Sequence, residues 1–535
     1  MSGALGGFGE FNMELLWRNR FCQGVKRGGE YVCGGETDEN AVNKVVELLG
    51  EAVGRILKWR VWEAWWVVEA MDEWLTARDR LEVQLRGKYG DEVVNAITGL
   101  VDKFIGYNEQ FLNYWREVGD EAKELIEDLM SGRAEVIIWE GEKGISVHRE
   151  YITLEAHRTS TGGVTVHLML NELEGVDIEV PDVFKKTMSK EEYERFINEV
   201  LKALEGGFEE ADGFVKDGYA AMNTTQVWQA IVWSLLYPGE DYVHVKAVNV
   251  NEGGLTITWR LRTNHDPLKG RIFNDVEKLG EEELLAFTFT AVLGDGYADV
   301  EELKINGRVY DEAVIAIAMS GEKFKRWEPL LEKLKGMGFN WGSVPINNSV
   351  INVRFYSGNA INLARAMINV LPPILKDILD ALGFDKWVRI RRIAEMEVKF
   401  RRGEMRITVA GYGFTVHVQK GTVELEHCTK SDVEVDEVIN ALKAVYGNGL
   451  QARVNTRKSG KYRVVTIPMH VFERYEDIKA QVVKVLCRKL ERVKDERKKQ
   501  IITKHLRRLT PTKGAVAVEH PNRESTQANP GNQNL

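Results

Sequence analysis

The chain has 535 residues, of which 44% are hydrophobic and 29% charged, and its formal net charge is −9. This length predicts several domains, because single cores rarely grow past about 250–300 residues. The composition is that of a globular protein, and the negative charge excludes one that coats nucleic acid over its whole surface. The sequence has neither an uncharged apolar run of about 18 residues nor a basic segment followed by an apolar core at its start. We therefore expect a cytoplasmic protein without a membrane partner.

Residues 1–36 are rich in glycine and are predicted to be flexible. Cys22 and Cys33 flank a hairpin-like segment that could set them opposite each other. A disulfide is one interpretation, since intracellular proteins of hyperthermophiles form them. Two free thiols are the favoured one. Cys428 and Cys487 lie far away, and no cysteine pair has metal-binding spacing.

Residues 37–132 predict a helical hairpin or small bundle, with long helices over about residues 39–86 and 92–130. The first helix carries a stripe of tryptophans: Trp59, Trp62, Trp65, Trp66 and Trp74. Such a stripe usually packs in a core, and we favour that interpretation. An exposed docking face for a partner is the alternative.

Residues 133–270 predict an α+β domain that begins with strands over residues 134–180. Ser189 and Glu192 form a capping box at the start of a helix that is predicted to stop at Gly206-Gly207. The next segment is expected to be a loop with four carboxylates: Glu209, Glu210, Asp212 and Asp217. Their spacing is not that of a calcium-binding loop, so solvated turns are favoured over a cation site.

Residues 281–297 form the most informative segment. Three acids open it, as suits the positive end of a helix, and an apolar run follows that ends in Gly294-Asp295-Gly296. The glycines predict a left-handed helix stop. Asp295 would then lie beside carbonyls that have no intrahelical partner. A hard divalent cation such as Mg²⁺ is favoured at such a place; a solvated turn is the alternative.

The segments that follow are a hairpin around Asn306-Gly307, a helix over 321–337, a strand over 350–356 and a helix over 359–370. With the helix before them, they resemble one αββαββα repeat of the LAGLIDADG homing endonucleases. The resemblance implies a domain over residues 271–384 in which Asp295 is the catalytic magnesium ligand, completed by Asp299 or a backbone carbonyl. It also implies a two-helix seam, with Ala286, Thr290, Ala291 and Gly294 as its residues. The chain shows one good motif, so the resemblance implies a homodimer.

Residues 385–490 predict an antiparallel sheet and a helix, and residues 491–535 the basic end of that helix and a disordered tail. The helix is expected over residues 475–509, with its second half projecting from the body. Basic residues that could contact double-stranded DNA fall in both segments: Arg389, Arg391, Arg392, Arg401, Arg402, Arg406, Arg497, Lys498, Lys499, Arg507 and Arg508. A solvated charged face is the alternative. The strands over residues 298–319 are acidic, which disfavours DNA on them.

Several longer runs resemble the PaREP repeat-element proteins (second class, b type) of the hyperthermophilic archaeon Pyrobaculum: NELEGV (171–176), VWSLLYPG (232–239), LAFTFTAVLGDG (285–296), AMINVLPP (366–373) and VAGYGFTV (409–416). This resemblance implies a multicopy protein of mobile-element origin. Two functions stay open. One is a DNA-binding protein with a LAGLIDADG-like, magnesium-dependent endonuclease domain, active or decayed. The other is a non-enzymatic interaction or scaffold protein.

Overall fold

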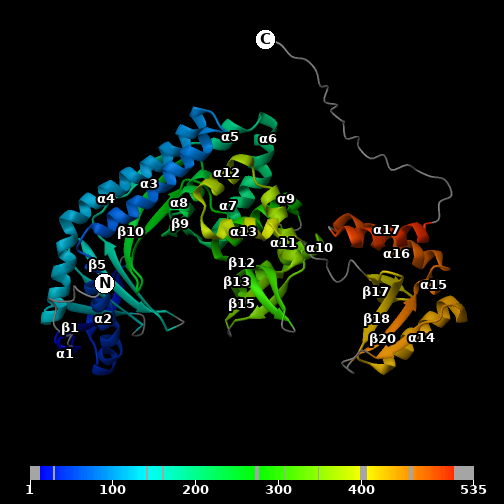
Figure 1. Ribbon diagram of the computed structural model, residues 1–535. Helices are drawn as coiled ribbons and strands as arrows, with labels where there is room; N and C mark the ends of the chain where they lie inside the picture. Colours follow the sequence, from blue (N-terminus) through cyan, green and yellow to red (C-terminus); the bar gives the residue numbers. More distant parts are fainter. Residues whose placement is uncertain are drawn as a thin grey trace, which may run out of the picture. The chain divides into compact units, whose positions relative to one another are not determined.

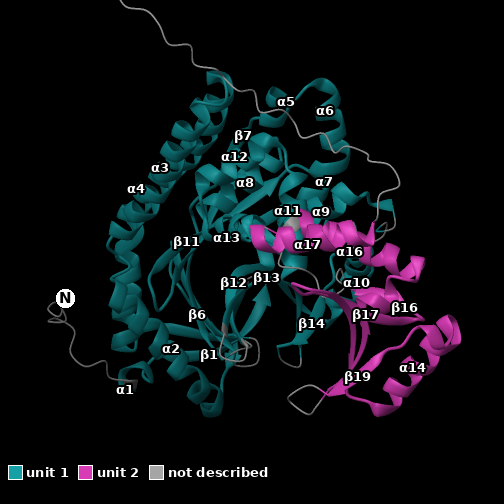
Figure 2. Ribbon diagram, turned by 45° about the vertical axis from the view of Figure 1, so that its right-hand side comes forward, with its two compact units in different colours: residues 1–398 teal, residues 399–535 magenta. Residues whose placement is uncertain are grey.

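The computed structural model describes residues 13–27, 30–139, 143–159, 162–271, 276, 278–305, 308–346, 349–397, 406–456, 462–493 and 495–510. The predicted turn at 306–307 and the tail beyond residue 510 lie outside them. The chain divides into two compact units, residues 1–398 and 399–535 (Figure 2). Both are mixed α+β, as predicted. None of the described helices is long and apolar enough to cross a membrane.

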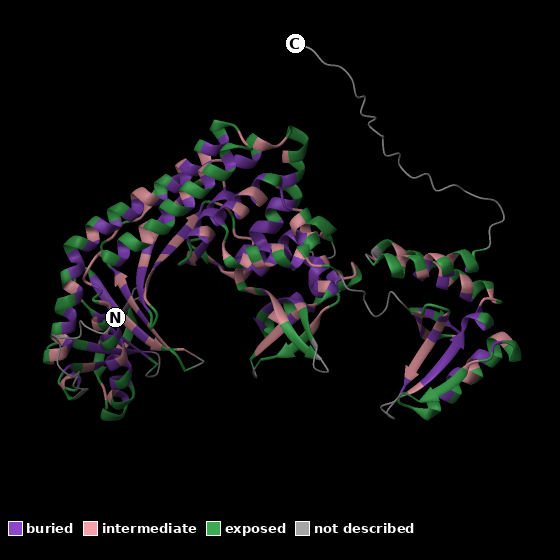
Figure 3. Ribbon diagram, viewed as in Figure 1, coloured by how far each residue is buried: buried purple, intermediate pink, exposed green. Residues whose placement is uncertain are grey.

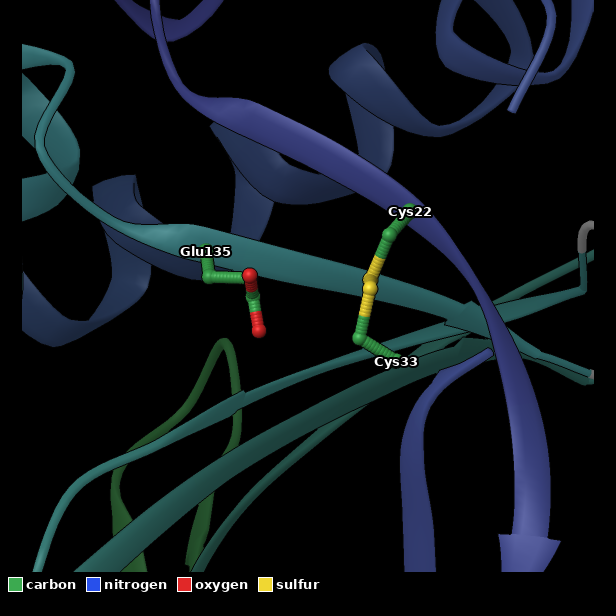
Figure 4. A group of neighbouring side chains, drawn as sticks. All are labelled: Cys22, Cys33 and Glu135. Carbon is green, nitrogen blue, oxygen red and sulfur yellow. A yellow bond between two sulfur atoms is a disulfide. The ribbon is translucent and has the colours of Figure 1, made fainter. Parts of the chain in front are cut away.

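Unit 1 begins with a hairpin inside the segment that the sequence predicts to be flexible. It comprises α1 (Met13–Leu16), β1 (Arg20–Arg27) and β2 (Glu30–Glu36). A register shift at Gln23/Gly24 brings Cys33 beside Cys22, with Cα atoms 5.6 Å apart, and the two are joined by a disulfide (Figure 4). The preference for free thiols was therefore wrong. Glu135, which lies near both sulfurs, forms an ion pair with Arg20 at 3.2 Å.

Three helices follow: α2 (Glu39–Trp59), α3 (Trp65–Arg86) and α4 (Asp91–Ser131). The first predicted helix is broken because Arg60 adopts a left-handed conformation after α2. The tryptophans mainly serve the core, as favoured: Trp66 and Trp74 are buried, and Trp74 stacks on Phe104 of α4. Trp65, by contrast, is 40% exposed.

The described strands of the first sheet run in the order β2-β1-β3-β4-β5-β6-β10-β11-β9-β8, with β7 paired to β10 (Figure 1). Trp259 of β11 packs edge-on against Trp74 of α3, and its indole donates to Asn108 of α4, so these helices cover one face. The strands are β3 (Glu135–Trp139), β4 (Gly144–His148), β5 (Ile152–Arg158), β6 (Val164–Leu170), β7 (Val176–Val180), β8 (Gly213–Lys216), β9 (Tyr219–Thr224), β10 (Gly239–Val250) and β11 (Leu255–Thr263). The helices between them are α5 (Val183–Thr187), α6 (Lys190–Arg195), the π-helix η1 (Phe196–Leu201), α7 (Lys202–Ala211) and α8 (Val227–Leu236).

A second sheet has the described order β12-β13-β15-β14. Its elements are α9 (Glu281–Asp295), β12 (Gly296–Ile305), β13 (Arg308–Ser320), α10 (Gly321–Gly336), β14 (Gly342–Pro345) and β15 (Val350–Tyr356). Three helices complete unit 1: α11 (Gly358–Asn369), α12 (Pro373–Leu382) and α13 (Asp385–Glu395).

Unit 1 contains the same supersecondary pattern twice. A helix, a hairpin, a second helix and a second hairpin follow one another from α7 to β11 and again from α9 to β15. The strand orders also agree, β8-β9-β11-β10 in the first copy and β12-β13-β15-β14 in the second. One hydrophobic core runs from Leu16 to Ile393, so the domain boundaries predicted near residues 132, 270 and 384 all fall within it. Figure 3 shows buried residues in purple along the strands of this unit and along the helices that pack on them.

Residues 385–395 differ from the predicted sheet. They form α13, because Trp387, Ile390 and Ile393 bury one face of a helix. Trp387 packs edge-on against Phe289 of α9, with ring centroids 5.9 Å apart. Three of the predicted DNA-binding arginines therefore belong to a helix of unit 1.

Unit 2 holds a sheet with the order β16-β17-β18-β20-β19, covered by helices over a separate core. The predicted terminal helix is broken at Val493, and Asp495 caps a new helix. This last helix does not project: Ile502, His505 and Leu509 are buried. The elements are β16 (Arg406–Val409), β17 (Tyr412–Val418), β18 (Val423–Thr429), α14 (Asp432–Tyr446), the 3₁₀ helix η3 (Gly447–Gly449), β19 (Arg453–Thr456), β20 (Arg463–Pro468), α15 (Met469–Phe472), α16 (Glu476–Arg492) and α17 (Glu496–Leu509).

Candidate metal and nucleic-acid site

Helices α7 and α9, the first elements of the two copies, lie side by side in unit 1 (Figures 1 and 2). A Cβ atom at Gly207 of α7 would overlap the carbonyl of Phe287 and the hydroxyl of Thr290 in α9. A Cβ atom at Gly294 would overlap the side chain of Ala211 and lie 2.7 Å from Asp212 Oδ2. The glycines therefore permit a close approach of two helix backbones.

This geometry changes the interpretation of both glycine pairs. Gly206 and Gly207 lie inside α7 instead of ending it. Gly294 is also helical, and α9 continues to Asp295 without a left-handed stop, since the capping residue Gly296 has φ −83°. Gly294 is needed because Ala211 and Asp212 press against it. The predicted loop with four carboxylates is thus partly the end of a helix.

The predicted seam residues fall on α9 in different ways. Thr290 and Gly294 contact α7, as the overlaps above show, and the Thr290 hydroxyl donates to the carbonyl of Ala286 at 3.3 Å. Ala291 is buried. The two bulky rings of this helix pack on other elements: Phe287 on Trp327 of α10, and Phe289 on Trp387 of α13.

A second motif acid was missed by the sequence reasoning. Asp212-Gly213-Phe214 follows α7 as Asp295-Gly296-Tyr297 ends α9, and both lead into the first strand of a hairpin. The shared Asp-Gly-aromatic run, each preceded by a small residue, was the available signal. The two acids belong to one chain, so no second copy is required to supply the helix that faces α9. A homodimer stays a prediction.

Two lysines lie at this pair of helix ends. Lys323 of α10 donates to the Asp295 carboxylate at 2.7 Å and to the carbonyl of Glu210 at 2.8 Å. Lys386 of α13 donates to the carbonyl of Leu293 at 2.6 Å and also to that of Gly294. Each ammonium thus satisfies carbonyls that a helix end leaves unpaired.

The two carboxylates interact electrostatically. Burial, and next the negative charge of Asp295, raise the pKa of Asp212. Hydrogen bonding from the Gln229 amide opposes this shift, as do the charges of Lys386 and Lys323. Burial lowers the pKa of Lys386, although both acids favour its charged form. The site is therefore a compact group of two carboxylates and two ammonium groups.

The donor atoms fit a hard divalent cation, which prefers carboxylate and carbonyl oxygens. Asp212 and Asp295 supply the carboxylates, and Glu210, Leu293 and Gly294 have carbonyls at the same helix ends. A hollow of about 390 Å³ adjoins Asp212 and is lined in part by Trp228, Gln229, Gly294, Phe384 and Lys386.

Asp299, the second predicted metal ligand, lies on β12. Its carboxylate accepts from Arg389 of α13 at 2.9 Å and from the Tyr297 hydroxyl at 3.1 Å. The structure thus joins Asp299 to α13 through an ion pair. Part of the acidity of the strands over residues 298–319 is neutralised in this way.

The predicted DNA-binding residues are divided between the units. In unit 1, Arg391 lies over the ring of Trp387 and Arg392 is exposed. In unit 2, Arg406 is exposed at the start of β16, whereas Arg401 and Arg402 lie outside the described residues. The other predicted residues lie on α17: Arg497, Lys498, Arg507 and Arg508 are exposed, and Lys499 is half-buried. Lys499 forms an ion pair with Glu496, and Arg508 with Glu473.

The sequence reasoning also missed a basic face on the first sheet. Arg260 and Arg262 alternate along β11 with Trp259 and Leu261, which are buried, and so lie on the opposite face. His244 is the cross-strand partner of Arg260. Burial lowers the pKa of Arg260 and of Lys246, and the charge of Arg260 lowers the latter further. The sequence signal for this face was the alternation of basic and apolar residues along β10 and β11.

Comparison with solved structures finds low-identity likenesses. The meganuclease I-SmaMI bound to uncleaveable DNA is 10% identical with a TM-score of 0.14, covering 44% of this chain and 98% of its own. The LAGLIDADG homing endonuclease I-GzeII in complex with its DNA target is 13% identical with a TM-score of 0.12, covering 40% and 93%. Full-length DUF199/WhiA from Thermatoga maritima is 11% identical with a TM-score of 0.20, covering 58% and 90%.

TM-scores this low do not by themselves establish a shared fold. No protein-family model matches the chain, and no curated protein matches it. The resemblance to PaREP proteins therefore stays a prediction.

Proposed function

We propose that the chain is a DNA-binding protein of mobile-element origin whose first unit carries a LAGLIDADG-like, magnesium-dependent phosphodiesterase site. The observation that carries this proposal is the pairing of Asp212 and Asp295 at the ends of two closely packed helices, each opening one copy of the same αββαββ pattern. Asp212 would complete the site in place of Asp299 or a backbone carbonyl, the two ligands that the resemblance implied.

The residues of the chain would act through charge and position. Asp212 and Asp295 would hold the cation together with carbonyls of α7 and α9, and Gln229 and Lys323 would orient the two carboxylates. A bound Mg²⁺ would supply a hydroxide and neutralise charge that builds on the phosphate. The basic residues of β10 and β11 would bind the phosphate backbone of the DNA. The exposed basic residues of α17 in unit 2 would add phosphate contacts.

The test is nicking of supercoiled plasmid with Mg²⁺ by the full chain. Asp212→Asn and Asp295→Asn should each abolish nicking while DNA binding, measured by fluorescence anisotropy, is kept. Asp311→Asn, which changes an exposed acid of β13, should behave as the wild type. Nicking that survives in both site variants would exclude this metal site from the reaction.

A non-enzymatic scaffold is the second candidate, and one observation favours it: the ammonium of Lys323 already forms an ion pair with Asp295, and the charges of Lys386 and Lys323 act on Asp212. The tryptophan-rich helices give it less support, because they cover the first sheet and bury most of their rings in the common core. It predicts that the wild type and both site variants bind DNA equally and that none of them nicks it.

A further inference from the structure

Lys386 stands out because it reaches the acid pair from outside both repeated copies. It belongs to α13, which follows the second copy, yet its ammonium bonds the last carbonyls of α9. It also lies close enough to Asp212 and Asp295 for both charges to act on it. A divalent cation at this site would need the same oxygens.

The helix that carries Lys386 is firmly attached. Phe384, just before α13, stacks on Trp228 of α8 with ring centroids 3.8 Å apart and planes 5° from parallel. Trp387 is 1% exposed and packs on Phe289 of α9. Arg389 pairs with Asp299 of β12. The helix that carries the ammonium is therefore fixed by packing on both sides of Lys386.

Lys323 differs from Lys386 in what it holds together. It comes from α10 within the second copy and joins Asp295 to the carbonyl of Glu210. Its removal would loosen α9 from α7. Removal of Lys386 would instead free the carbonyls of α9, next to the hollow of about 390 Å³.

We propose that α13 is an autoinhibitory element: the ammonium of Lys386 occupies the place of the divalent cation at Asp212 and Asp295, and the cation binds only when Lys386 is displaced. This inference rests on the proposed function, since it concerns the same site. The physical reason is that a divalent cation and an ammonium repel each other at short range and cannot both bind the carbonyl oxygens of Leu293 and Gly294.

The experiment is Mn²⁺ binding to the full chain, followed by electron paramagnetic resonance of the free ion. Lys386→Met should bind Mn²⁺ about tenfold more tightly than the wild type, or more. Asp212→Asn in the Lys386→Met background should remove the gain. Lys333→Met is the matched control, because Lys333 of α10 also donates to two backbone carbonyls, those of Val276 and Leu279, away from the acids.

A second readout follows α13 itself. Saturating Mn²⁺ should speed amide hydrogen exchange in α13 of the wild type, because the cation displaces Lys386. Unchanged exchange in α13 on binding would overturn the proposal, even if Mn²⁺ binds. A tryptophan-fluorescence melt of each variant checks that unit 1 remains folded.

The outcomes separate the two ideas. Equal Mn²⁺ affinity in the wild type and in Lys386→Met, lost in Asp212→Asn, would overturn the autoinhibitory role and leave the metal site standing. No Mn²⁺ binding in either folded protein would overturn the metal site and the inference together. A gain equal to that of Lys333→Met would reduce the effect to net charge and also overturn the inference.

Discussion

The ammonium of Lys323 lies 2.7 Å from the carboxylate of Asp295, and its second hydrogen bond goes to the carbonyl of Glu210 in the neighbouring helix. One side chain thus ties the end of α9 to the end of α7. Only 15% of the Lys323 side chain is exposed, so the bond is partly shielded from solvent. Asp295 is thereby attached to the helix end that directly precedes Asp212.

The close approach at Gly207 predicts a large cost for one methyl group. Gly207→Ala should lower the free energy of unfolding of unit 1 by about 1–3 kcal/mol, because the helices must separate. Denaturation followed by tryptophan fluorescence measures it, since all 14 tryptophans lie between Trp17 and Trp387. Gly54→Ala, at an exposed position in α2 with open space around it, should stabilise by up to about 1 kcal/mol. Equal effects of the two changes would contradict the seam.

The buried Glu205 on α7 predicts a pH dependence of stability. Burial, and next the charge of Glu209, raise the pKa of Glu205 to about 8. A group with a raised folded pKa contributes stability that is full below its unfolded pKa, near 4.5, and is lost as the pH rises to about 8. The wild type should thus lose about 2 kcal/mol between pH 6 and 8 from this group.

Glu205→Gln should remove most of that loss and make the protein more stable than the wild type at pH 8.5. Urea denaturation at several pH values, read by tryptophan fluorescence, gives the profile. Glu199→Gln, at an exposed position in η1, should leave the profile unchanged. A Glu205→Gln profile parallel to that of the wild type would show that the carboxyl is not protonated in the folded state.

The disulfide between Cys22 and Cys33 closes a short loop of the N-terminal hairpin. Cys22→Ser should cost about 3 kcal/mol in the stability of this hairpin, because the unfolded chain regains the conformational entropy that the closed loop removes. Hydrogen exchange of β1 and β2, with and without reductant, measures it. Reductant should affect the wild type but not Cys22→Ser. Cys487 is a free, exposed cysteine of α16. In Cys487→Ser, hydrogen exchange of β1 and β2 should equal that of the wild type.

The exposed basic residues of α17 predict salt-dependent DNA binding. Arg507→Ala should weaken binding to duplex DNA independently of its sequence and lower the slope of log affinity against log salt by about 1. Anisotropy titrations at several salt concentrations measure both. Lys443→Ala, at an exposed position on α14, removes the same charge elsewhere in unit 2. Identical results for the two variants would mean that α17 does not contact phosphate.

Local patterns in the sequence determined much of what the chain forms. The acids and apolar run before Asp295 predicted α9, and Ser189 with Glu192 predicted the capped start of α6, because caps and periodicity act within a few residues. The amphipathic face of α13 was also readable, since Trp387, Ile390 and Ile393 recur at helical spacing, but residues 385–395 were assigned to the antiparallel sheet that follows them.

Only the tertiary structure decided what the glycines and the acids do. Gly206-Gly207 could end a helix or let a second helix approach, and the sequence carries no signal that separates these roles; contact with Phe287 and Thr290 does. The sequence placed Asp212 in a loop, whereas the packing of α7 beside α9 places it next to Gly294. The approach of Lys386 to the same helix ends depends on the packing of Trp387 and Phe384, which are far in sequence from Asp212. Gly294-Asp295-Gly296 could therefore be recognised from the sequence, and the Asp-Gly-aromatic run at Asp212 was a signal for a second motif acid. The approach of the two acids and the two lysines could not be predicted, because long-range packing alone brings them together.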